Sequence, residues 1–333
     1  MLSGDLLVQM DAGLDTPAND QARPVQAGGF ERDMARALAV RPRAISPKYF
    51  YDAQGSRLFD QICELPEYYP TRTELGILRD NAEQVARQMG PRAEIVEFGA
   101  GSLLKVRLLL DAMDRPSRYL PIDISGDHLT ASAEDLSRDY PGLQVKPVVA
   151  DYTQRMLLPA ALPGSGQRVG FFPGSTIGNF TPDEALQFLR GAGQLLRGGA
   201  LLLGADLIKE PALLHAAYND SQGVTARFNL NLLARANREL GADFDLSQFA
   251  HSAFYNAPLQ RIEMHLVSRC RQSIALAGES FELAQGDSIH TENSHKFTVD
   301  SLRALAARAG FKPGPVWTDP QGLFSVHWLH APT

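Results

Sequence analysis

The sequence predicts an α/β protein built on an open, mostly parallel sheet, with a second, smaller α+β unit inserted into it. First, short apolar runs alternate with amphipathic helical patterns from residue 94 to residue 206, as in βαβ units. Second, the chain ends in a helical pattern and two apolar runs joined by a turn at 319–322, which predicts an antiparallel hairpin. Third, residues 209–297 interrupt the alternation.

The composition is that of an ordinary globular protein. The chain has 333 residues, 44% of them hydrophobic and 21% charged, and its net charge of −6 argues against a general nucleic-acid binder. Cys63 and Cys270 are the only cysteines, which excludes a disulfide framework. No apolar run approaches the roughly 20 residues of a membrane helix, and a secretory signal pattern is absent. We therefore expect a cytoplasmic protein without nucleic-acid or membrane partners.

The first part of the chain is expected to be mostly helical. Residues 1–25 mix prolines with polar residues and predict a flexible arm. The spacing of Phe30, Met34 and Leu38 predicts a helix. Further expected elements are a short helix around 58–62 that ends before Pro66, a turn over 67–71 and a helix over 74–89.

The alternating region supplies the sheet. The expected strands are 94–98, 118–124, 145–151, 167–172 and 199–206, and the expected helices are 105–113, 127–137 and 182–196. A helix over 298–309 and a hairpin of 315–318 with 323–329 follow. Five parallel strands completed by a hairpin predict the Rossmann-like, seven-stranded sheet of class I methyltransferases, whereas a plain dinucleotide fold more often ends on a parallel strand.

The interruption has a pattern of its own. Residues 209–245 are helical in character, and antiparallel strands are expected between 250 and 292, among them 261–267 and 272–276. This predicts an inserted second domain.

A glycine-rich turn follows the first strand of the alternating region. Gly99-Ala100-Gly101 stands between a strand and a helix, where a ligand can approach the backbone and the helix N-terminus. A dinucleotide fingerprint has a third glycine where this chain has Leu104, so a nucleoside without phosphates, such as S-adenosylmethionine, fits better. A simple tight turn is the alternative.

Acidic residues end the next two strands. Asp123 is suited to accept hydrogen bonds from both ribose hydroxyls, and Asp151 from an adenine amine, with Tyr152 packing on the adenine ring. A helix N-cap and a loop aspartate are the plain alternatives. Because the carboxyl ends of parallel strands share one edge, the three features in order predict one ligand site.

Asn179 ends the fourth strand's loop, and its amide can both donate to and accept from an amine or a carboxylate. A turn asparagine is the alternative. Tyr51, Tyr68 and Tyr69 are clustered near prolines and predict either a wall of hydroxyls around a polar ligand or simple packing.

The segment 290–295 contains two histidines, but their spacing and the lack of a helical His-Glu-x-x-His pattern argue against a metal site. On a strand, Glu292 and Ser294 point to the same side and are suited to hold one polar ring. Cys63 is expected to be a buried core thiol.

These residues lie in longer strings that resemble the histidine-specific Nα-methyltransferases of ergothioneine biosynthesis. The resemblance covers residues 30–333. The strings, in the family's order, are FYDAQGSRLFDQICELPEYYPTRTE, EFGAGSLLK, PIDIS, VVADY, GSTIGNFTP, AAYNDSQGVTARFNLNLLARANRELGADFD and HTENSHKF.

The resemblance implies a fold and a reaction. The fold would be a class I, SAM-dependent methyltransferase domain of residues 73–208 plus 298–333, with a substrate-binding domain of residues 26–72 plus 209–297. The enzyme would trimethylate the α-nitrogen of L-histidine to hercynine, the first step of ergothioneine biosynthesis, and release S-adenosylhomocysteine. It would act as a monomer on this small-molecule substrate, without a metal.

The resemblance also implies site residues. Those holding S-adenosylmethionine would be Gly99, Lys105, Asp123, Asp151 and Tyr152. Those holding histidine would be Tyr68, Asn179, Tyr218, Glu292 and Ser294. Asn179 and the tyrosines would take the amino-acid end, Glu292 and Ser294 would take the imidazole, and Tyr51 and Asn179 would serve the reacting nitrogen.

Three other functions remain open on the residues alone. They are a SAM-dependent N-methyltransferase of another amino acid or small amine, a nicotinamide-dependent oxidoreductase, and a sensor that binds S-adenosylmethionine without catalysis. The missing third glycine and the closing hairpin count against the oxidoreductase, and the retained second-substrate residues count against the sensor.

Overall fold

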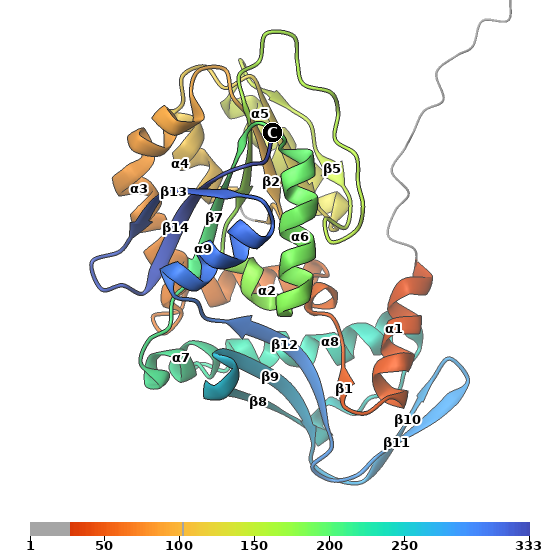
Figure 1. The fold of residues 1–333 in the computed structure, drawn as a ribbon. Helices are drawn as coiled ribbons and strands as arrows, with labels where there is room; N and C mark the ends of the chain where they lie inside the picture. Colours follow the sequence, from red (N-terminus) through yellow and green to blue (C-terminus); the bar gives the residue numbers. More distant parts are fainter. Residues whose placement is uncertain (1–26, 102) are drawn as a thin grey trace, which may run out of the picture.

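The computed structural model describes residues 27–101 and 103–333, so the predicted arm over 1–25 lies outside the described residues. Figure 1 shows two lobes, one built on a large twisted sheet and one on a smaller sheet with helices beside it. The chain passes between the lobes more than once.

The large sheet has the strand order β13-β14-β7-β6-β2-β3-β4, and β5 continues β4 beside β3. The strands are β2 Glu94–Phe98, β3 Arg118–Asp123, β4 Gln144–Val145, β5 Val148–Val149, β6 Arg168–Phe172, β7 Ala200–Asp206, β13 Lys312–Thr318 and β14 Phe324–His330. All pair in parallel except β14, which runs antiparallel to both of its neighbours, β7 and β13. With β4 and β5 as one position, the sheet has the seven predicted strands, and the α/β methyltransferase fold is confirmed.

Element boundaries differ from the expected ones at two prolines in particular. The strand expected over 145–151 is broken into β4 and β5, because Pro147 has no N–H to donate to β3. The turn expected over 67–71 is partly helical, since α3 already begins at Tyr69. Pro70 lies in its first turn, where a missing N–H costs no helical hydrogen bond.

Helices cover both faces of the large sheet. They are α3 Tyr69–Met89, α4 Leu104–Ala112, α5 Gly126–Asp139, α6 Pro182–Leu195 and α9 Val299–Arg308. Alternate side chains of β2 enter different cores, because Ile95 packs with α3 and α4 while Val96 and Phe98 pack with α6 and α9. The large sheet is thus buried on both faces, as parallel sheets generally are.

The smaller sheet has the order β1-β12-β9-β8. Its lobe contains β1 Arg43–Ala44, β8 Phe249–Asn256, β9 Arg261–Ser268, β12 Ser288–His295, the hairpin β10 Gln272–Leu276 with β11 Glu279–Leu283, and the helices α1 Ala27–Ala39, α2 Ala53–Glu64, α7 Pro211–Tyr218 and α8 Val224–Leu240. The short 3-10 turns are η1 Pro47–Phe50, η2 Thr176–Asn179, η3 Leu246–Gln248 and η4 Ala257–Leu259. One apolar core joins residues from 30 to 69 with residues from 214 to 289, so the N-terminal segment packs against the insertion.

The chain leaves and re-enters the large sheet at adjacent points. The N–H of Phe297 donates to the carbonyl of Asp206 at 2.9 Å, and Leu207 bridges Phe297 in parallel. Gly178 of η2 packs directly on β12, because an added Cβ would lie 2.7 Å from the His295 carbonyl oxygen. These contacts hold β12 at the carboxyl edge of the large sheet.

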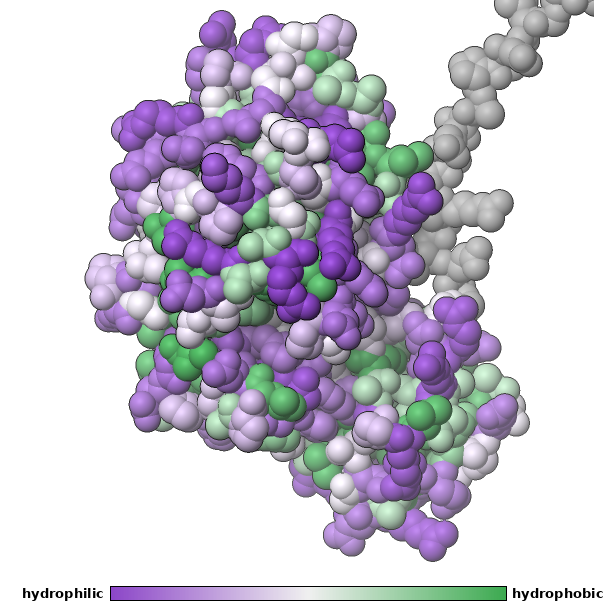
Figure 2. Space-filling view, viewed as in Figure 1, coloured by the Kyte–Doolittle hydropathy of each residue, from purple (hydrophilic) through white to green (hydrophobic). Residues whose placement is uncertain are grey.

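Figure 2 shows that the viewed face is mostly hydrophilic, with hydrophobic side chains in small separate groups. Within 27–101 and 103–333, every helix is too short or too polar to cross a membrane.

Candidate active site

The glycine turn closes onto the end of the neighbouring strand. Gly99 has a φ of +76°, and its N–H and that of Ala100 donate to the Ile122 carbonyl at 2.9 and 3.0 Å. The turn therefore lies beside Asp123, the last residue of β3. The Ala150 N–H donates to the Asp123 carbonyl at 3.0 Å, which brings the segment after β5 to the same edge. The glycine turn, Asp123 and the segment that leads to Asp151 therefore lie together at the carboxyl edge of the large sheet.

Local hydrogen bonds fix the two acids at this edge. Asp123 accepts the Ser125 N–H at 2.8 Å. Asp151 accepts the Lys48 ammonium at 3.1 Å on one oxygen and the Thr153 N–H at 2.9 Å on the other. Burial opposes ionisation of Asp151, but its hydrogen bonds and the charge of Lys48 outweigh burial and lower its pKa. Asp151 is therefore an ionised hydrogen-bond acceptor.

Tyr152 covers the glycine turn. Its ring packs edge-on against Phe98, Phe172 and Phe188, with centroid distances of 6.4, 5.7 and 5.9 Å. An added Cβ on Gly99 would lie 3.4 Å from this ring. Both the positive φ and the close aromatic ring therefore favour glycine at this position.

Lys105 lies in the first turn of α4 and pairs with a buried acid. Its ammonium is 2.5 Å from the carboxylate of Glu74, which also accepts the Gly174 N–H at 2.9 Å. This pair joins α3, α4 and the loop after β6. It holds a cation beside the loop that leads to Asn179.

A small pocket lies in the second lobe next to this edge. Its lining residues come from α2, α7, α8, β9, β12 and the start of α3, and they are Phe59, Ile62, Tyr68, Ala217, Tyr218, Thr225, Phe228, Met264 and Glu292. Three predicted substrate residues, Tyr68, Tyr218 and Glu292, are therefore brought together. The rest of the lining is mainly apolar.

Glu292 is the acid of this pocket. Within the described ranges its carboxylate makes no hydrogen bond or ion pair. Burial raises its pKa to about 7, although the charge of Lys296 opposes the rise. Glu292 is half-buried. A carboxylate largely removed from water without a partner is costly, and a ligand N–H would relieve that cost.

A β-bulge aims Glu292 at the pocket. The register between β12 and β9 shifts between His290 and Glu292. The intervening Thr291 is buried, and its hydroxyl oxygen lies 2.8 Å from the Asn229 side-chain oxygen and 3.1 Å from the Met264 carbonyl, so its single hydrogen is shared between these two acceptors. Bulges of this kind redirect side chains beside functional sites.

The other predicted residue of β12, Ser294, is buried against the pocket tyrosine. The Tyr218 hydroxyl donates to Ser294 Oγ at 2.7 Å, and the ammonium of Lys296 contacts both oxygens. The sequence analysis missed Lys296. The string HTENSHKF contains it, because Lys296 follows Ser294 by two residues and therefore continues the same alternation of the strand.

Tyr51 lies between the pocket and the carboxyl edge of the large sheet. Its carbonyl accepts the Ser125 hydroxyl at 3.2 Å. Burial raises the pKa of its phenol, and the nearby charges of Glu292 and Asp123 add to the rise. Tyr51 is therefore close to both halves of the candidate site.

Asn179 is half-buried at the end of η2, the turn that packs on β12. Its amide makes no hydrogen bond in the part of the chain that the structure describes. Besides Lys296, the sequence analysis missed residues that line the pocket, among them Thr225, Phe228 and Met264. In the sequence these residues look like ordinary core positions.

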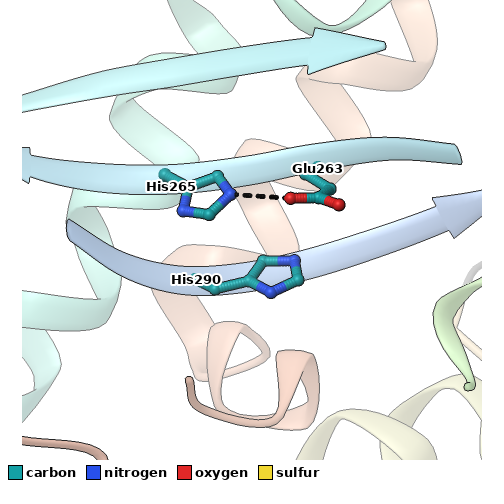
Figure 3. A group of neighbouring side chains, drawn as sticks. All are labelled: Glu263, His265 and His290. Atoms are coloured by element: carbon teal, nitrogen blue, oxygen red, sulfur yellow. Dashed lines mark hydrogen bonds and ion pairs between the residues drawn. The ribbon is translucent and has the colours of Figure 1, made fainter. Parts of the chain in front are cut away.

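Among the described residues, one group of possible metal ligands lies elsewhere on the small sheet. Figure 3 shows Glu263 and His265 on β9 and His290 on the adjacent β12. The two imidazole rings stack at 4.6 Å with an angle of 11°, so their in-plane nitrogens do not converge on one point. Glu263 already accepts from His265 at 3.1 Å, Asn256 at 2.9 Å and Arg261 at 2.7 Å. This arrangement is a hydrogen-bonded cluster that supports the sheet.

Comparisons with known proteins agree on one family. Residues 30–331 match the model of a family described as histidine-specific, SAM-dependent methyltransferases. The chain is 41% identical over 315 residues to the histidine N-alpha-methyltransferase of Mycolicibacterium smegmatis, covering 93% of this chain and 97% of that one. It is 42% identical over 304 residues to the protein of the same name from Mycobacterium tuberculosis, covering 89% and 93%. It is also 29% identical to ergothioneine biosynthesis protein 1 of Neurospora crassa, covering 83% of this chain and 32% of that one. This chain belongs to the family of histidine-specific, SAM-dependent methyltransferases.

Proposed function

We propose that this enzyme transfers three methyl groups in succession from S-adenosylmethionine to the α-nitrogen of L-histidine, giving hercynine, the first intermediate of ergothioneine biosynthesis. The observation that carries the proposal is the Glu292 carboxylate, which has no hydrogen-bond or ion-pair partner among the described residues and lies in a pocket close to Tyr51, the residue that is also near Asp123. The names of the relatives above support the histidine substrate and the pathway.

The residues at the sheet edge fit S-adenosylmethionine. The glycine turn leaves room beside Gly101, where an added Cβ would meet no atom of the described residues within 4 Å apart from its chain neighbours. Asp123 would accept from the ribose hydroxyls and Asp151 from the adenine amine, with Tyr152 against the adenine ring. Lys105 would take the carboxylate of the methionine part. Bound there, the cofactor supplies a methyl group on a sulfonium that is a good leaving group.

The pocket residues would hold histidine at both ends. Glu292 and Ser294 would take the imidazole, while Asn179 with Tyr68 and Tyr218 would take the amino-acid end. Each methylation removes one N–H donor from the amine. Contacts to the ring and the carboxylate survive that loss, so the same pocket serves three rounds.

The protein's contribution to the reaction would be mainly alignment. The attacking amine must be neutral and in line with the methyl group, and orientation of this kind lowers the barrier substantially. Tyr51 and Asn179 would orient the amine. We further propose that residues 73–208 plus 298–333 form the methyltransferase domain, that 26–72 plus 209–297 form the substrate domain, and that one chain suffices for activity.

Another amino acid or a small amine is the alternative substrate. Glu292 favours histidine, because an apolar side chain would leave a buried carboxylate without a donor. The test is a mass-spectrometric endpoint assay with S-adenosylmethionine and, separately, histidine, tryptophan, tyrosine and histamine. We expect a gain of three methyl groups on histidine alone. Transfer to another of these compounds but not to histidine would overturn the proposal.

A further inference from the structure

Lys296 is a buried cation that follows β12 and lies behind two predicted substrate residues. Its side chain is 0% exposed. The ammonium contacts Asp206 at 2.8 Å, Ser294 Oγ at 2.7 Å and Tyr218 Oη at 3.2 Å. An ammonium has three hydrogens and no acceptor site, so these three partners use all of them. Lys296 therefore acts on a ligand only through its partners.

The contacts of the Lys296 ammonium determine how many hydrogens the Tyr218 and Ser294 hydroxyls have left to donate. Tyr218 and Ser294 together have two hydrogens to donate. Lys296 donates to both oxygens, and the bond between the hydroxyls consumes one hydrogen. One hydroxyl hydrogen remains, whichever hydroxyl donates to the other. In the described part of the chain neither hydroxyl donates to any further group, so this hydrogen has no acceptor there, and Tyr218 is the one of the two residues that lines the pocket.

The charge around Lys296 is also defined. Asp206 accepts from Lys296, from Lys209 at 2.5 Å and from the Tyr69 hydroxyl at 2.8 Å. Burial opposes the charged form of Lys296, but Asp206 and Tyr218 outweigh burial and raise its pKa. Lys296 therefore stays protonated and remains a donor at neutral pH.

We propose that Lys296 is a positioning residue that makes the Tyr218–Ser294 pair a hydrogen-bond donor to the unprotonated ring nitrogen of the substrate, while Glu292 accepts the N–H of the same ring. The inference rests on the proposed function and revises one role in it, because it gives Tyr218 to the ring and not to the amino-acid end of the substrate. Glu292 and Ser294 are two residues apart in the regular register after the bulge, so they stand on one face of β12. The pocket then recognises the neutral imidazole through two hydrogen bonds. Glu292 accepts from the ring N–H, and the Tyr218–Ser294 pair donates to the other ring nitrogen.

The first test compares Lys296→Met with Lys209→Met. Both variants remove a lysine from Asp206, but only Lys296 touches the two hydroxyls. We expect Lys296→Met to raise the KM for histidine about tenfold or more, with a smaller change in kcat and unchanged affinity for S-adenosylmethionine. Equal effects of the two variants would overturn the inference.

The pH dependence of the KM for histidine distinguishes this role from a merely structural one, because a structural role of Lys296 would leave that pH dependence unchanged. The groups that face Glu292 are Tyr51, Tyr68, Tyr218 and Lys296, and His290 contacts its carbonyl from the same strand. Burial raises the pKa of Glu292, and the positive charge of Lys296 opposes that rise. In Lys296→Met the acid limb of the histidine KM profile should move to higher pH, and in Lys209→Met it should stay in place. An unmoved limb in Lys296→Met would contradict the inference.

A second test does not depend on replacing Lys296. In Tyr218→Phe or Ser294→Ala the remaining hydroxyl still accepts from Lys296 and keeps one free hydrogen. Each single variant should therefore raise the dissociation constant for histidine only a few-fold, while the double variant raises it by more than the product of the two. A simple product would overturn the hydrogen count.

Histamine has the imidazole ring of histidine but no carboxylate. It therefore tests whether the ring nitrogen or the substrate carboxylate accepts the hydrogen bond from the Tyr218–Ser294 pair. A comparable loss of histamine affinity in Lys296→Met supports the ring nitrogen, whereas a loss confined to histidine overturns that assignment. If the unmodified enzyme methylates histidine but both lysine variants behave alike, the inference alone fails. If the unmodified enzyme does not methylate histidine, the proposed function fails.

Discussion

Replacing Glu292 by glutamine should change histidine affinity and protein stability in opposite directions. Glutamine keeps the size of the side chain and removes its charge. A hydrogen bond to a charged group is worth about 1.5–3 kcal/mol, so the dissociation constant for histidine should rise roughly 10- to 150-fold.

The stability effect follows from the raised pKa. Burial raises the pKa of Glu292 from 4.5 to about 7. The folded chain therefore holds this proton more tightly than the unfolded chain, and stability falls as pH rises from about 4.5 to about 7. Above that range the carboxylate costs the folded state on the order of 2 kcal/mol, allowing for its partial exposure. Glu292→Gln should thus melt at a higher temperature than the unmodified protein at pH 8.

The assay is calorimetric titration of histidine in the presence of S-adenosylhomocysteine, together with thermal unfolding at pH 8. Glu263→Gln is the matched control on the neighbouring strand. Burial opposes ionisation of Glu263, but Arg261 and its other donors outweigh burial and lower its pKa to about 2, so this substitution should lower stability. Unchanged histidine affinity in Glu292→Gln, or a parallel fall in affinity and stability, would refute the reasoning.

Three further outcomes are expected. Asp123→Ala should weaken binding of S-adenosylmethionine about tenfold or more in calorimetry, because the ribose hydroxyls lose their acceptor, and unchanged affinity would undo that assignment. Thr291→Val should raise the KM for histidine and leave cofactor affinity unchanged, since it removes the hydroxyl that anchors the bulge to Asn229; equal losses of both affinities would point to general unfolding. Histidine affinity, corrected for the titration of free histidine, should increase between pH 6 and pH 8 as Glu292 ionises, and a flat profile would contradict an ionised Glu292 as the acceptor.

The sheet and its ligand edge were predictable because their signals are local. Alternating apolar runs and the residue at each strand's end are properties of neighbouring positions in the chain, and parallel strands place their carboxyl ends together. The same local view misplaced element boundaries at two prolines in particular. The apolar residues around Pro147 predicted one continuous strand, but the structure has two short strands there. The residues around Pro70 predicted a turn, but Pro70 lies in the first turn of α3.

The interior of the pocket was predictable only in part. Glu292 and Ser294 follow from the alternation of a strand, but the bulge at Thr291 depends on contacts with Asn229 and Met264 that no local pattern reveals. Lys296 has the sequence character of a surface lysine. Its burial depends on Asp206, which belongs to the other lobe's sheet and lies far away along the chain.

The most direct test of the central claim is a crystal structure of the enzyme with S-adenosylhomocysteine and histidine bound. Our account predicts the cofactor product along Gly99, Asp123 and Asp151, a histidine ring nitrogen at about 3 Å from the Glu292 carboxylate, and the α-nitrogen facing the sulfur. A histidine whose ring lies away from Glu292, or whose α-nitrogen points away from the sulfur, would contradict it.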